Sequence, residues 1–144
     1  MNIVAGVTSR PESRVALDRA IDEVKLRGGH LYIIHTMDQG LKSGAATARD
    51  WTSAVAAERA TGERIVEELA EQGIEATYRV ELANSGPAAT LLEVAEEVGA
   101  DLIVIGIRRR SAVGKLVLGS VSQAVLLGAD CPVLAVKGAE DDAA

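Results

Sequence analysis

Short apolar runs alternate with longer amphipathic stretches along the whole chain, and this alternation restricts the possible folds more than any other feature. The apolar runs predict strands at Asn2–Val7, Leu31–Thr36, Ala76–Leu82, Leu102–Gly106 and Val133–Val136. The second, fourth and fifth are almost continuously apolar, which is typical of parallel strands covered on both faces. Helices are predicted between the strands, near residues 12–27, 47–72, 87–98 and 118–127. This repetition predicts an α/β fold, an open parallel sheet with right-handed crossovers and helices on both faces.

Glycine and proline support these boundaries. A glycine just after a helix can adopt the left-handed conformation that closes the last turn. The predicted helices are followed by Gly28, Gly73, Gly99 and Gly128. Pro87 stands where the first residue of the third helix is expected, a position that suits proline because its missing N–H would have no partner there.

Length, charge and composition narrow the classes of protein. The chain has 144 residues and no linker, so we expect one domain over residues 1–137 and a disordered acidic tail over 138–144. Its net charge of −6 argues against nucleic acid as a partner, because binding to nucleic acid depends on cationic contacts to phosphate. A single cysteine fits a reducing compartment, and no apolar run is long enough to span a membrane. We therefore expect a cytoplasmic protein with no membrane partner.

The segment from Gly106 to Ser122 predicts an anion site. The fourth strand ends at Gly106, where a glycine lets the chain turn and a ligand approach the backbone, and Gly119 opens the last helix. The first N–H groups of a helix have no partner within it and carry partial positive charge, so they bind anions. The intervening loop supplies cations that can neutralise phosphate, namely Arg108, Arg109, Arg110 and Lys115. A small-molecule phosphate is the ligand that this segment favours.

Plainer interpretations of the same residues stay open. The segment can be a structural turn, and the arginines can be a solvated charge run or a docking surface for an acidic partner. Thr8, at the end of the first strand, is better explained as a cap of the first helix than as a ligand contact. His35 is expected to be structural, because no serine or cysteine nucleophile is evident beside it.

Over residues 2–137 the chain resembles the universal stress protein family. Members that bind ATP carry Gly, two residues, Gly, nine residues, and then Gly-Ser or Gly-Thr. Gly106 and Gly119-Ser120 match the first and last parts of this motif, whereas Arg109 replaces the second glycine. Thr8 stands where the family commonly has an aspartate that helps to hold the nucleotide. The ending Ala129–Val136 is also similar to the last strand of the family.

The resemblance implies a doubly wound five-stranded sheet in the order 3-2-1-4-5. It implies ATP or AMP as ligand, with Mg²⁺ as a candidate companion, and a homodimer formed through the last strand, Val133–Val136. Adenine is implied near Gly6, Thr36 and Ile105, and phosphates are implied near Gly106 and from Gly119 to Ser122. The complete set of candidate ligand-binding residues is Gly6, Thr8, Thr36, Ile105, Gly106, Arg108, Arg109, Lys115, Gly119, Ser120, Val121 and Ser122.

Two functions follow from these observations. The first is an adenine-nucleotide-binding stress-response protein that senses or sequesters its ligand. No positioned general base or nucleophile is evident, so we expect no enzyme activity beyond slow incidental ATP hydrolysis. The alternative is a member of the family that binds no nucleotide and acts as a dimeric protein-interaction module, which Arg109 and Thr8 favour.

Overall fold

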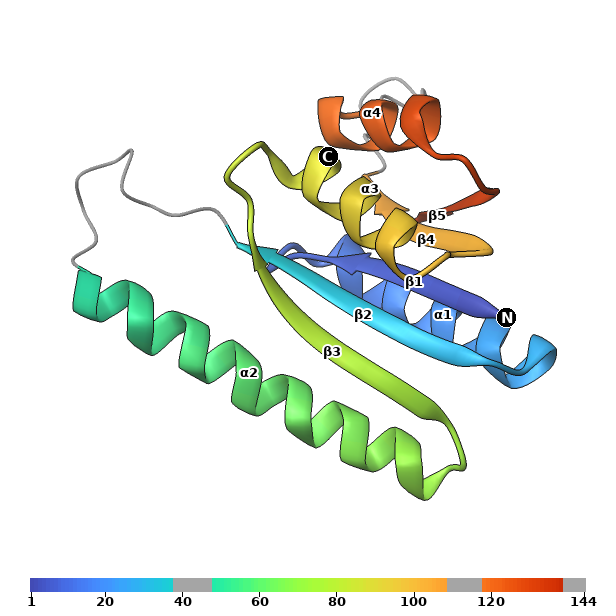
Figure 1. Ribbon diagram of the computed structural model, residues 1–144, viewed down its shortest axis with the longest axis horizontal. Coiled ribbons are helices and arrows are strands. Elements are labelled where there is room, and N and C mark those ends of the chain that lie inside the picture. Colours follow the sequence, from blue (N-terminus) through green and yellow to red (C-terminus); the bar gives the residue numbers. More distant parts are fainter. Residues whose placement is uncertain (38–47, 109–117, 139–144) are drawn as a thin grey trace.

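The computed structural model describes residues 1–37, 48–108 and 118–138, and they form a parallel sheet with helices on both faces (Figure 1). The strands are β1 (Asn2–Val7), β2 (His30–Met37), β3 (Glu75–Leu82), β4 (Leu102–Ile107) and β5 (Val133–Lys137). The helices are α1 (Glu12–Arg27), α2 (Ala48–Glu71), α3 (Pro87–Glu97) and α4 (Ser120–Gly128). All pairings in the sheet are parallel and the order is β3-β2-β1-β4-β5, which confirms the predicted fold class and strand order.

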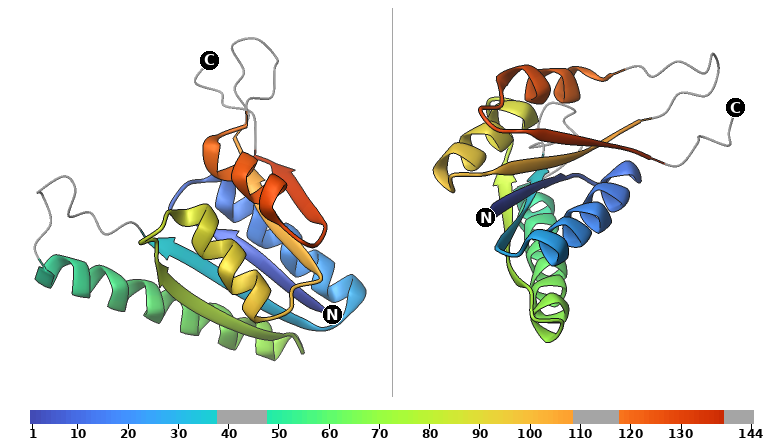
Figure 2. Two further views of the ribbon diagram at one scale, coloured as in Figure 1. Left: turned by 45° about the horizontal axis from the view of Figure 1, so that its top comes forward. Right: turned by 90° about the vertical axis from the view of Figure 1, so that its right-hand side faces the viewer.

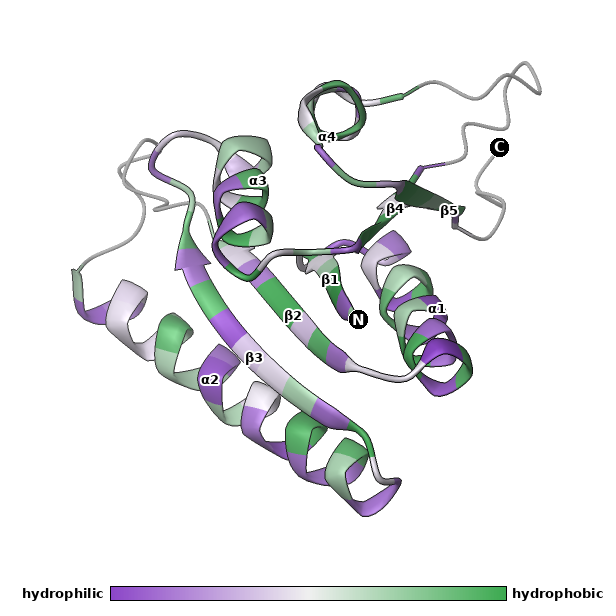
Figure 3. Cartoon of the chain, turned by 45° about the vertical axis from the view of Figure 1, so that its right-hand side comes forward, coloured by the Kyte–Doolittle hydropathy of each residue, from purple (hydrophilic) through white to green (hydrophobic). Residues whose placement is uncertain are grey.

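Each face of the sheet has its own apolar core. Side chains alternate along a strand, so neighbouring residues such as Ile3 and Val4 point to opposite faces, and both are fully buried. Residues of α1 and α2 pack on the Ile3 face, and residues of α3 and α4 pack on the Val4 face. Figure 2 shows the helices on either side of the sheet, and Figure 3 shows that β2 and β4 are largely hydrophobic. This double burial explains the continuous apolar runs in the sequence.

The helix boundaries differ from prediction at α4. The helix begins at Ser120, with Gly119 as its N-cap, and extends through Gly128. Gly128 is therefore a helical residue and not a left-handed cap. A Cβ at Gly128 would lie 2.8 Å from Leu92 Cδ1, so the close packing of α3 explains this glycine. Gly28, Gly73 and Gly99 do have positive φ, at 75°, 77° and 62°, as predicted.

The pairing of β5 with β4 continues one residue beyond the predicted domain. Gly138, which we assigned to the acidic tail, is buried, and its N–H donates to the carbonyl of Ile107 at 3.0 Å. The contact continues the pairing of β5 with β4. The rest of the predicted tail, 139–144, lies outside the described residues.

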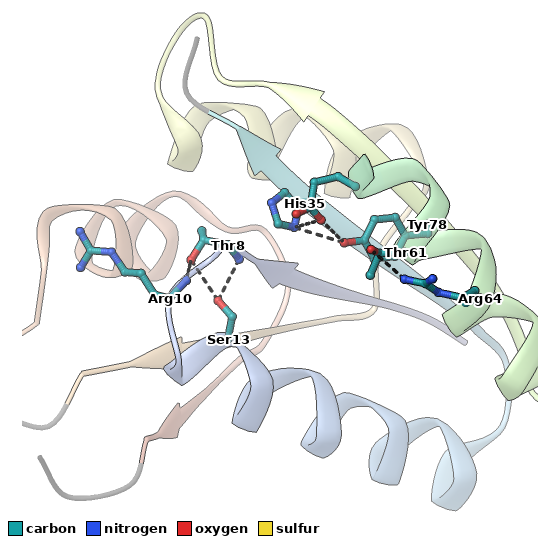
Figure 4. A network of polar contacts seen from close by, with 8 residues as sticks. Thr8, Arg10, Ser13, His35, Thr61, Arg64 and Tyr78 are labelled. Atoms are coloured by element: carbon teal, nitrogen blue, oxygen red, sulfur yellow. Dashed lines mark hydrogen bonds and ion pairs between the residues drawn. The ribbon is translucent and has the colours of Figure 1, made fainter. Parts of the chain in front are cut away.

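A small polar cluster holds α2 against the sheet. Gly62 of α2 packs directly on the ring of Tyr78 in β3. The Tyr78 hydroxyl lies 3.2 Å from His35 Nδ1 and donates to the Glu58 carboxylate at 3.4 Å (Figure 4). His35 is 7% exposed, and its Nδ1 lies 3.5 Å from Glu58 Oε2. His35 thus has the structural environment that we expected.

This cluster predicts that the protein loses stability on mild acidification. Burial lowers the pKa of the His35 imidazole, and the Glu58 carboxylate partly offsets that effect. The pKa of His35 is lower in the folded state than in the unfolded state. The contribution of neutral His35 to the free energy of unfolding is therefore fully present above about pH 6.5 and is lost as the pH falls through the folded-state pKa. We expect the free energy of unfolding, measured with urea, to fall between about pH 7.5 and about pH 5.5. His35→Gln should flatten this dependence, and Glu58→Gln should steepen it. An unchanged slope in His35→Gln would contradict the interpretation.

Candidate functional site

A cleft opens at the carboxyl ends of β1, β2 and β4, beside the first turns of α3 and α4. Its volume is about 310 Å³. Ligands of open α/β sheets bind at this edge, where the strand order reverses. Every candidate residue that the structure describes lines this cleft: Gly6, Thr8, Thr36, Ile105, Gly106, Arg108, Gly119, Ser120, Val121 and Ser122. Arg109 and Lys115 lie outside the described residues, as does Arg110. The structure thus brings together the described candidates from separate parts of the chain.

One wall of the cleft is apolar. Ile105 at the end of β4 and Leu91 of α3 line it, and Val125 of α4 lies beside them. These side chains are 6%, 4% and 0% exposed. Gly6 lies on the same face, where a Cβ would come within 2.7 Å of Leu91 Cδ2. The close approach of α3 therefore explains the glycine at this position, and the apolar wall suits a flat uncharged group such as a nucleobase.

Gly106 also has a packing role that the sequence did not indicate. It lies within β4 rather than in a turn, and a Cβ there would collide with the backbone carbonyl of Glu12. The collision lies on the face covered by α1, because Gly106 alternates with Ile105 along the strand. Packing of the first turn of α1 therefore requires a glycine here, and the predicted contact of Gly106 with a ligand stays a prediction.

The first turn of α4, which lines the same cleft, suits an anion. Gly119 caps α4 without a side-chain hydrogen bond, so the N–H groups of the first turn keep their partial positive charge. Ser120 and Val121 are exposed and Ser122 is half-buried. A Cβ at Gly119 would lie more than 4 Å from every described residue other than its chain neighbours and the backbone of α4, and the Gly119 φ of −68° suits any residue. Among the described residues, none fills the space beside this helix end.

Thr8 holds the turn between β1 and α1. Its N–H donates to Ser13 Oγ at 2.8 Å, and its hydroxyl accepts from the N–H of Arg10 at 3.2 Å (Figure 4). The two hydroxyl oxygens of Thr8 and Ser13 are 3.1 Å apart. The N-cap of α1 is Pro11, which has no side-chain cap, so the prediction that Thr8 caps the helix was wrong. The hydrogen bonds of Thr8 instead stabilise the turn that leads from β1 into α1.

Sequence reasoning missed several lining residues. Arg10 is the most consequential, because it adds a cation to the cleft from the turn after β1. Its position two residues after Thr8, in a strand-to-helix turn, is the only signal that could have identified it. Glu12, Ser13 and Pro87 also line the cleft, as do the packing residues Val7, Leu91 and Val125.

Within 1–37, 48–108 and 118–138, no three His, Cys, Asp or Glu side chains are grouped so that they could hold a metal ion. Across the same ranges, no helix has the length and apolar character needed to cross a membrane.

Comparison with known proteins gives a consistent result. The family model described as "Universal stress protein family" matches residues 1–137. A universal stress protein of Mycolicibacterium smegmatis is 37% identical over 138 residues, which cover 94% of this chain and 96% of the relative. A universal stress protein of Archaeoglobus fulgidus has a solved structure with a TM-score of 0.72 and 32% identity, covering 95% of this chain and 98% of that one. A structure of the universal stress protein from the same organism in complex with dAMP has a TM-score of 0.66 and 28% identity, with the same coverage. The chain belongs to the universal stress protein family.

Proposed function

We propose that this protein binds an adenine nucleotide, ATP or AMP, in the cleft at the carboxyl ends of β1, β2 and β4, and that it acts as a sensor or a sequestering module in a stress response. The supporting observation is that one cleft joins an apolar wall, formed by Ile105 and Leu91, to the open N-terminus of α4. A nucleotide has a flat base and an anionic phosphate group, so the apolar wall and the helix N-terminus match its two parts. The dAMP complex of the Archaeoglobus fulgidus relative supports the same ligand class.

Binding rather than catalysis is the activity that the lining residues favour. The described part of the lining contains no histidine, cysteine or lysine. Glu12 is the one carboxylate of this described lining, and it forms no hydrogen bond with a lining hydroxyl such as that of Ser13 or Ser120. We therefore propose that ATP hydrolysis, if measured, is slow and incidental.

Isothermal titration calorimetry with ATP, ADP and AMP tests the proposal. We expect saturable binding with a dissociation constant in the micromolar range, which corresponds to roughly −8 kcal/mol. Adenosine serves as the control that lacks phosphate, and it should bind more weakly than AMP. If none of the nucleotides binds up to millimolar concentration, the proposed ligand is wrong.

A second candidate function has its own supporting observation. β5 is an edge strand whose residues Val133–Val136 are apolar and half-buried, and Val121 and Leu127 of α4 are 42% and 84% exposed. An apolar edge strand favours pairing with a second copy, so we propose a homodimer through β5.

A dimer that docks a protein partner through Arg108–Arg110 would need no nucleotide. Replacing these arginines with alanine would then abolish partner capture and leave nucleotide titrations unchanged.

A further inference from the structure

We infer that the cleft binds its nucleotide without a divalent metal ion. Arg10 and Arg108 neutralise the phosphate charge that Mg²⁺ usually neutralises in a bound triphosphate. This inference rests on the proposed function and deepens it. It concerns which ionic form of the nucleotide the site selects.

The oxygen ligands that Mg²⁺ needs are scarce in this cleft. Magnesium sites usually combine one or two carboxylates with phosphate oxygens and water in octahedral geometry. Glu12 is the single carboxylate among the described lining residues. Its Cβ would lie 3.4 Å from a Cβ at Gly106 and 3.2 Å from one at Gly138. The stem of Glu12 therefore lies on the α1 face of the sheet, away from the apolar wall formed by Leu91.

The oxygen at the end of β1 is also committed to other partners. The Thr8 hydroxyl accepts from the Arg10 N–H and is paired with the hydroxyl of Ser13. To ligate a metal ion, Thr8 would have to give up contacts that hold the turn between β1 and α1. A neutral hydroxyl also contributes no charge toward a divalent cation, unlike a carboxylate.

Two guanidinium groups supply positive charge at the same place. Arg10 follows β1 and Arg108 follows β4, and both line the cleft and are exposed. Neither forms an ion pair with any residue in the described part of the chain. A guanidinium binds phosphate oxygens in bidentate fashion and repels a metal ion that would compete for them. The site therefore favours metal-free nucleotide, and AMP, which holds Mg²⁺ weakly, suits it better than Mg·ATP.

Calorimetric titration with ATP in EDTA and again in excess MgCl₂ tests the inference. We expect ATP to bind at least as tightly in EDTA as in MgCl₂, and AMP to bind equally in the two buffers. Arg10→Gln should weaken ATP binding in EDTA about tenfold, the loss of one charge-assisted contact, and should change adenosine binding little. Arg14→Gln is the matched control. Arg14 carries the same charge four residues later, in the first turn of α1, is exposed and pairs with Asp18, and does not line the cleft.

The possible outcomes distinguish failure of the metal-free site from failure of the proposed nucleotide binding. ATP binding that needs Mg²⁺, or that tightens tenfold or more with it, overturns the metal-free site and leaves the proposed function standing. No binding of any nucleotide in either buffer overturns the proposed function itself. An Arg10→Gln effect no larger than that of Arg14→Gln overturns the assignment of Arg10. Thr8→Asp adds a carboxylate at the end of β1 and should make ATP binding stronger in MgCl₂ than in EDTA, a gain that a purely structural Thr8 would not give.

Discussion

We expect Gly119→Val to weaken ATP binding at least about 100-fold, close to 3 kcal/mol, while the protein stays folded. The valine side chain would occupy the space beside the first turn of α4, where the described residues outside α4 and the neighbours of Gly119 lie more than 4 Å from the added Cβ. A phosphate placed there would lose several charge-assisted hydrogen bonds, each contributing about 1.5–3 kcal/mol. Because the φ of Gly119 is −68°, the substitution introduces no backbone strain. Calorimetry with ATP and AMP measures the loss, and circular dichroism checks the fold.

Gly119→Ala separates the site from the helix cap. Alanine and valine are both poor N-cap residues, so the two variants share any cost to the start of α4. Only valine adds a branched side chain to the space beside the N–H groups. Binding should therefore fall in the order glycine, alanine, valine. Equal binding by the parent and the valine variant would mean that the phosphates lie elsewhere.

The second large effect concerns stability. Gly62→Val should destabilise the protein by about 3 kcal/mol and lower Tm by roughly 9 °C. A Cβ at Gly62 would overlap the ring of Tyr78, so α2 would have to move away from β3 and strain the contact between Glu58 and Tyr78. Thermal and urea unfolding, followed by far-UV circular dichroism, measure the change. In an exposed helix, replacing a glycine with valine would instead be mildly favourable, by about 0.4 kcal/mol.

Two controls isolate the contact between α2 and β3. Ala60→Val introduces the same side chain at an exposed position of α2 and should cost only about 0.6 kcal/mol. In a Tyr78→Ala background, the ring that opposes the new side chain is gone. Gly62→Val should then cost much less, and the double-mutant cycle should give a coupling free energy of about 2 kcal/mol. Additive effects would show that another contact explains the glycine.

Periodicity in the sequence predicted most of the fold because the chain buries both faces of its sheet. The run Asn2–Val7 is β1 as predicted, and β4 exceeds its prediction only by Ile107. Boundaries shifted where tertiary packing decides them. Gly128 continues α4 and lies close to Leu92, a contact that no local pattern indicates.

The features that the sequence did not predict depend on contacts between residues that are far apart in the chain. Gly62 resembles a weak point in a helix, and only the position of Tyr78 shows why it is needed. Gly106 suggests a turn at the end of a strand, yet Glu12 approaches it from a different part of the chain. Arg10 belongs to the cleft because the turn after β1 places it on the same cleft as Arg108, which comes nearly a hundred residues later in the chain. The candidate residues in the described part of the anion-binding segment do line one cleft, and their role there stays a prediction.

The two borders of the sheet differ in a way that limits self-assembly. β3, on one border, carries Glu75, Arg79 and Glu81, whereas β5, on the other, presents the apolar residues Val133–Val136. Charged borders resist the addition of a further strand. If two copies joined β5 to β5, as proposed, β3 would stand at both outer ends, and its charges would oppose the addition of a third copy.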